Sequence, residues 1–101
     1  MKLKFKIICT YTDDPFSASY FKCKDFKVKN RADHEKYVNF ICDSSKNVIG
    51  AFLVAYNEAN DFCSSAPLNA NAVVYGEFLK ETDKICARLG GWETNVEGVG
   101  A

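Results

Sequence analysis

The sequence lacks the features that mark a membrane, disulfide-bonded or metal-binding protein. No apolar run approaches the roughly 18 residues that a membrane-spanning helix requires. The five cysteines, at positions 9, 23, 42, 63 and 86, are widely and irregularly spaced and form no CxxC pair. A disulfide framework normally uses an even set of cysteines, and a structural zinc site uses close pairs. We therefore predict free thiols, a reducing and cytoplasmic location, no metal and no membrane contact.

Motifs for catalysis and cofactor binding are also scarce. The chain contains neither GxxxxGK[ST] nor GxGxxG, the two common phosphate-binding loops. His34 is the only histidine and lies between two acidic residues, where we expect a solvated loop. A cysteine nucleophile would have to use His34 as its base, and Cys63 is the one thiol outside the apolar patterns. We predict a protein that is not an enzyme and needs no cofactor; a small enzyme that uses Cys63 or a carboxylate is the weakest alternative.

What the chain does contain is enough apolar material for one folded domain. Hydrophobic residues make up 48% of the 101 residues and aromatic residues 14%. A disordered segment is much poorer in such groups, and this length suits a single core. We predict one α+β domain over residues 1–91 and a C-terminal tail over residues 92–101.

Alternation with a period of two predicts strands in the first half of the chain. Residues 2–11 alternate between lysine-rich and apolar positions, and a second extended segment covers residues 16–28. The apolar positions of this second segment change parity near residues 24–25, where we predict a β-bulge. Residues 37–42 and 48–56 are predicted as a third and a fourth strand. The last of these is apolar at both parities, which is typical of a central strand covered on both faces or by a partner.

The period then changes from two to about 3.6. Apolar residues at positions 75, 78, 79, 85, 86 and 89 follow the stripe of a helix that packs on a sheet. Gly90 and Gly91 are expected to end it, and residues 57–69 are expected to be mostly loop. The predicted fold is α+β: an antiparallel sheet of about four strands, in the order β-β-β-β-α, with one long C-terminal helix packed on one face.

Lysine is concentrated in the predicted sheet. The net charge is zero, but residues 1–50 carry ten basic and six acidic residues, whereas residues 51–101 carry three and seven. If the first two strands pair, they form a basic face that is the candidate partner-binding site: Lys2, Lys4, Lys6, Lys22, Lys24, Lys27 and Lys29. Tyr20 and Trp92 are the candidate interface aromatics. The alternative is that these lysines only solvate the sheet and block edge-to-edge association.

Missing catalytic motifs, segregated charge and a strand that is apolar on both faces together predict a non-catalytic module that binds another protein by surface complementarity. Compact, motif-free inhibitors from phages and mobile elements, anti-CRISPR proteins included, are of this style. A homodimer is a further prediction, because a second copy would cover the other face of residues 48–56. The alternative function is binding of nucleic acid or a nucleotide on the lysine-rich face.

Overall fold

The computed structural model describes residues 2–14, 21–69 and 74–92. Its elements, in chain order, are β1 (Lys2–Thr12), β2 (Lys22–Lys27), α1 (Arg31–Cys42), β3 (Asn47–Tyr56), β4 (Phe62–Leu68), α2 (Tyr75–Leu89) and β5 (Gly91–Trp92). The fold is α+β with an antiparallel sheet, as the sequence predicts. Neither helix in the described residues is long and apolar enough to cross a membrane.

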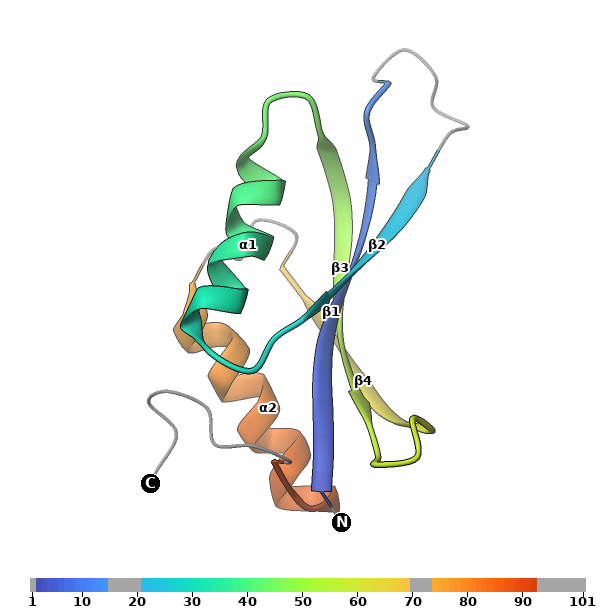
Figure 1. Ribbon diagram of the computed structural model, residues 1–101, viewed down its shortest axis with the longest axis vertical. Coiled ribbons are helices and arrows are strands. Elements are labelled where there is room, and N and C mark those ends of the chain that lie inside the picture. The colour runs from blue at the N-terminus through green and yellow to red at the C-terminus, as the bar shows by residue number, and fades with distance from the viewer. Residues whose placement is uncertain (1, 15–20, 70–73, 93–101) are drawn as a thin grey trace.

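Four strands form the sheet in the spatial order β2-β1-β3-β4, and each neighbouring pair is antiparallel. β5 adds a short parallel pairing at the start of β1, with Trp92 opposite Leu3. The rest of the predicted tail, residues 93–101, lies outside the described residues. Both helices lie on the same side of the sheet (Figure 1). The molecule therefore has two layers, and no described element covers the other side of the sheet.

The core lies between the helices and one side of the sheet. Alternate positions of β1 are buried, as the period of two predicts. Alternate positions of β3 face the same way, and each helix adds buried residues from one side. The largest fully buried members of this core include Leu3, Ile7, Tyr37, Leu53, Phe78 and Ile85.

α2 is the predicted C-terminal helix. Its buried side repeats every three or four residues, and the one polar member is Thr82, whose hydroxyl donates to the Leu79 carbonyl at 2.8 Å. The helix ends at Leu89 because Gly90 adopts φ 145°, a conformation that favours glycine. The glycine pair therefore acts as the predicted stop.

The prediction of a strand over residues 37–42 is wrong, because these residues belong to α1. Asn30 caps this helix: its side-chain oxygen accepts a hydrogen bond from the Asp33 N–H at 3.0 Å. His34 and Tyr37 are buried and lie about one turn apart. The polar segment before residue 37 is therefore the first turn of a helix, and the element order is ββαββα instead of ββββα.

The fourth strand of the sheet is β4, which lies in the segment predicted to be loop. It pairs with β3 from Ala51 opposite Leu68 to Tyr56 opposite Phe62. Small residues dominate its sequence and it contains Pro67, so it lacks the apolar alternation and β-branched residues by which strands are recognised. β4 forms one edge of the sheet, and β2 forms the other.

The predicted β-bulge near residues 24–25 is also wrong. β1 and β2 pair without a register shift. The change of parity has another cause: Phe26 and Val28 pack in the core, whereas Phe21 and Cys23, nearer the tip of the β1–β2 hairpin, are exposed. The part of the predicted strand before residue 21 lies outside the described residues.

Candidate binding surface

The pairing register defines the side of the sheet that faces away from the helices. Residues directly opposite each other on neighbouring strands point to the same side. One such row contains Lys27, Lys6, Val54 and Ser65, from β2 to β4. We call this side the open face. The residues that define it here are Lys4, Lys6, Lys27, Ile8, Phe52, Tyr56, Phe62 and Pro67.

The half of the open face over β3 and β4 is apolar. Phe52 is 48% exposed and Phe62 is 63% exposed. Phe52 lies between Ile8 of β1 and Pro67 of β4, so the apolar surface is continuous across three strands. Soluble proteins rarely leave several large apolar side chains together in water unless they bind something there. The apolar half of the open face is therefore a candidate interface.

The half over β1 and β2 is basic. The Lys6 ammonium forms an ion pair with Asp25 at 2.9 Å and lies 4.4 Å from the centroid of the Tyr56 ring. Hydrogen bonds, first to Asp25 and then to Tyr56, raise the pKa of Lys6. This lysine therefore carries its charge at neutral pH, at the boundary between the basic and apolar halves.

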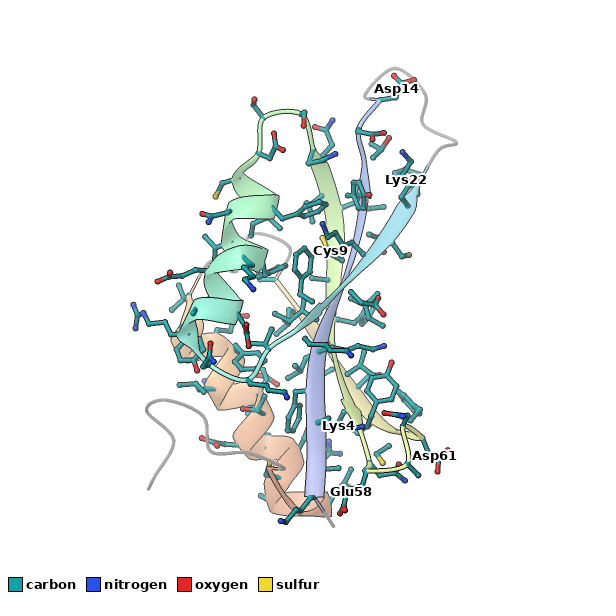
Figure 2. All side chains as sticks on the ribbon, in the orientation of Figure 1. Lys4, Cys9, Asp14, Lys22, Glu58 and Asp61 are labelled. Atoms are coloured by element: carbon teal, nitrogen blue, oxygen red, sulfur yellow. The ribbon has the colours of Figure 1, made fainter. Side chains whose placement is uncertain are left out.

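Lys4 extends the basic half along β1, and Lys27 extends it across to β2. Lys4 hydrogen-bonds to Asn60 in the turn between β3 and β4, at the end of the sheet where Figure 2 also shows Asp61. Lys27 is exposed and lies directly opposite Lys6. Only one carboxylate, that of Asp25, accompanies these three lysines among the paired positions of this half, so its net charge is positive.

The seven predicted lysines do not share one face. Lys22 and Lys24 pair with Tyr11 and Cys9 of β1 and therefore lie on the helix side of β2. The Lys24 ammonium lies 4.8 Å from the centroid of the Phe40 ring in α1. The prediction of a single basic face assumed a bulge in β2, and without that bulge the two lysines stay on the side of the core.

The remaining predicted site residues are scattered. Lys2 begins β1 beside β5. Lys29 follows β2, and its backbone N–H donates to the Asp33 carboxylate at 3.2 Å, at the start of α1. Tyr20 lies outside the described residues. Trp92 has a described backbone but no described side chain, so its role as an interface aromatic stays a prediction.

Lys46 takes part in an ion pair that the sequence did not predict. Its ammonium lies 3.8 Å from the Asp13 carboxylate, which also pairs with Lys22 at 3.1 Å. The hydrogen bond from Lys22 lowers the pKa of Asp13. Lys46 also lies 5.4 Å from the centroid of the Tyr11 ring. Lys22 reaches Asp13 through the β1–β2 pairing and Lys46 through the β1–β3 pairing, so no spacing in the sequence connects the two lysines.

The exposure of the cysteine side chains differs from what the sequence predicts. Cys23 and Cys42 are exposed, whereas Cys63, predicted as the one exposed thiol, is half-buried. Burial raises the pKa of Cys9 to about 11, which disfavours a thiolate. In the described part of the chain, no group of three or more His, Cys, Asp or Glu side chains is arranged to hold a metal ion.

His34 is buried in α1 and does not lie in a solvated loop. Its ring lies 5.1 Å from that of Tyr75 in α2 and 5.9 Å from that of Tyr37, centroid to centroid. Burial, and then the nearby charge of Arg31, lowers the pKa of His34; the charge of Glu35 opposes this change. His34 is therefore a neutral packing residue between the two helices at neutral pH.

We expect the free energy of unfolding to fall as the pH is lowered from about 7.5 toward 5.5, because the unfolded chain, with a histidine pKa of about 6.5, binds the proton more readily than the folded one. The contribution of neutral His34 to the free energy of unfolding is fully present above the histidine pKa of the unfolded chain. It is lost as the pH falls below that value toward the lower pKa of the folded chain. Urea denaturation at both pH values measures the loss. His34→Phe keeps a ring in place and should flatten this dependence, whereas an unchanged pH dependence in the variant would contradict the assignment.

Similarity to known proteins gives no information about the function of this surface. Comparisons with family models, with curated protein sequences and with solved structures give no match to the chain. The functional conclusion therefore depends on the open face itself.

Proposed function

We propose that the protein is a non-catalytic binding module that attaches to another protein through its open face. The observation that carries the proposal is the exposure of Phe52 and Phe62 beside lysines, on a side of the sheet that no described element covers. Aromatic side chains of this kind often supply much of the binding energy of protein interfaces. Both belong to paired strands, so little backbone freedom is lost when a partner binds.

Charge on the open face indicates the kind of partner. The basic half, with Lys4, Lys6 and Lys27, favours an acidic region on the partner. The apolar half favours an apolar region beside it. A second copy docked face to face would set these lysines against their own counterparts or against the apolar half, and would offer only Asp25 in return. The open face therefore suits a different protein better than it suits a second copy.

An inhibitor is the kind of binding module that these features suit best. We extend the proposal to an inhibitor of the phage or mobile-element type, in the style of anti-CRISPR proteins, which acts by occupying a surface of a host protein. The support for this is a two-layer architecture that leaves one side of the sheet for contact. Such a protein needs no catalytic group, because occupancy alone blocks its target.

Matched surface variants test the proposed interface. Phe52→Asp places a carboxylate in the apolar half and should weaken binding of a partner captured by the wild-type chain by roughly 30-fold, the effect of losing a strong anchor residue. Val74→Asp is the control, because Val74 is 59% exposed but directly precedes α2. A partner that binds both variants equally well would rule out the open face as the interface.

A second candidate function is binding of single-stranded nucleic acid on the same face. Rings at Phe52, Tyr56 and Phe62 share this face with lysines, and single-strand binders combine base stacking with backbone neutralisation in this way. The zero net charge is less typical of such proteins, which is why we place this function second.

Fluorescence anisotropy with a labelled oligothymidylate separates the two functions. A nucleic-acid binder should lose affinity steeply as salt rises, and Lys4→Ala/Lys27→Ala should reduce the slope of that loss. Lys22→Ala/Lys24→Ala is the control, because these lysines lie on the helix side. No binding at low salt, or binding that is insensitive to salt, would remove this candidate.

A further inference from the structure

We propose that the outer edge of β4 pairs with the same edge of a second copy, so that two chains form a dimer with one continuous sheet. This interface uses hydrogen-bonding groups in the plane of the sheet, whereas the function proposed above uses side chains on the open face. The two proposals are therefore independent, and each can fail without the other.

The two edges of the sheet differ in their protection against pairing. β2 has charged residues at four of its six positions, three of them lysines, and charge on an edge strand opposes pairing with another strand. β4 has no charged residue, and no strand pairs with its outer side among the described residues. A second copy would therefore meet no like charge along β4, whereas two β2 strands would bring lysines together.

Pro67 shows which backbone groups of β4 point outward. Pro67 lies opposite Phe52, and because proline has no N–H to donate, this must be a non-hydrogen-bonded pair. The two kinds of pair alternate along antiparallel strands, so Ser65, opposite Val54, forms the same kind of pair. The N–H and C=O of Ser65 therefore point away from β3, toward the outer edge.

A two-fold axis at Ser65 satisfies these groups. The Ser65 N–H of each copy would donate to the Ser65 carbonyl of the other, which is the reciprocal arrangement of a hydrogen-bonded antiparallel pair. Ser64 would then lie opposite Ala66 of the second copy, and both lie on the helix side of the sheet, so the faces of the two sheets match. An axis at Pro67 would offer no N–H, which leaves Ser65 as the centre.

This arrangement has a consequence for the proposed binding function. The axis is perpendicular to the sheet, so both open faces point the same way. The exposed Phe62 and Pro67 lie near the new boundary between the copies, so the apolar halves of the two open faces would adjoin there. The dimer would present two binding faces side by side and would bind a partner with repeated sites more tightly than a monomer does.

Light scattering with size-exclusion chromatography tests the dimer over a range of protein concentrations. The wild-type mass should rise to twice that of the monomer. Ser65→Pro removes the outward N–H and should weaken dimerisation by roughly tenfold or more, whereas Ser65→Ala keeps the N–H and should behave as the wild type. Phe52→Asp should leave the dimer intact, which separates this proposal from the function of the open face.

Two results would overturn the dimer. One is a wild-type chain that stays monomeric at the highest concentration, and the other is a Ser65→Pro chain that dimerises as the wild type does. If circular dichroism shows that Ser65→Pro does not fold, Ser65→Lys replaces it, because two ammonium groups would then face each other across the axis. Ser65→Lys should also be monomeric, and dimerisation equal to that of the wild type would contradict the proposed axis.

Discussion

Replacing Leu53 with alanine is expected to lower the free energy of unfolding by about 3 kcal/mol. Leu53 is 0% exposed and lies in β3 at the centre of the sheet. Alanine would remove buried apolar surface and leave a cavity that the surrounding strands and helices fill only in part. In a chain of this length, such a loss lowers Tm by roughly 12–24 °C. Thermal and urea denaturation followed by circular dichroism measure the change.

The neighbouring residue is the control for this experiment. Phe52 points to the open face and is about half exposed, so Phe52→Ala should change the free energy of unfolding by less than about 1 kcal/mol. The two variants differ by one position in β3 and test which side of the sheet is covered. Equal destabilisation by both would contradict the assignment of the faces.

Tyr37→Phe is expected to stabilise the protein by about 1–2 kcal/mol, although it removes a polar group and adds no contact. Tyr37 is 0% exposed, and its hydroxyl has no hydrogen-bond partner among the described residues. Burial raises the pKa of this tyrosine to about 12. Phenylalanine keeps the ring contact with Phe26, at 5.5 Å between centroids. It also removes the free-energy cost of desolvating the hydroxyl without a hydrogen bond.

Tyr11→Phe provides the matched comparison. Tyr11 is half-buried near the end of β1, so its hydroxyl is not taken fully out of water and its loss should change stability by less than about 0.5 kcal/mol. Urea denaturation of both variants under the same conditions makes the comparison. A Tyr37→Phe variant less stable than the wild type would show that the hydroxyl has a partner in the folded chain.

The parts of the fold that the sequence predicts well are those where one residue pattern has one explanation. β1 alternates between lysine and apolar side chains, and only a strand with one buried side has that period. α2 has a stripe with a helical period and a glycine that ends it. In both elements, local preference and tertiary packing favour the same structure.

α1 was missed because its first buried residue is a histidine. Once His34 is assigned to solvent, the apolar residues that follow look like a short strand. With His34 included, positions 34, 37, 38 and 41 form a helical stripe, and Asn30 lies at the place of a cap. The sequence therefore contained a signal for this helix, but its first member is polar and becomes buried only against the rings of α2.

The candidate site was predictable only in part. The sequence identifies lysines on one parity of β1 and aromatic residues in β3, but not which strand lies beside which. The β1–β3 pairing brings Lys6 to Tyr56 and Ile8 to Phe52, and β4, which was not predicted, adds Phe62. The open face is therefore a product of strand order, which depends on contacts between distant parts of the chain.

The central claim is that one side of the sheet is core and the other is exposed, and solvent paramagnetic relaxation enhancement tests it directly. A soluble, neutral gadolinium complex broadens the NMR signals of side chains that it can approach. Ile8 and Phe52 should be broadened strongly, and Ile7 and Leu53, their neighbours on the other side of the sheet, should be protected. Equal protection of all four side chains would contradict the account, because the proposed binding face would then be covered.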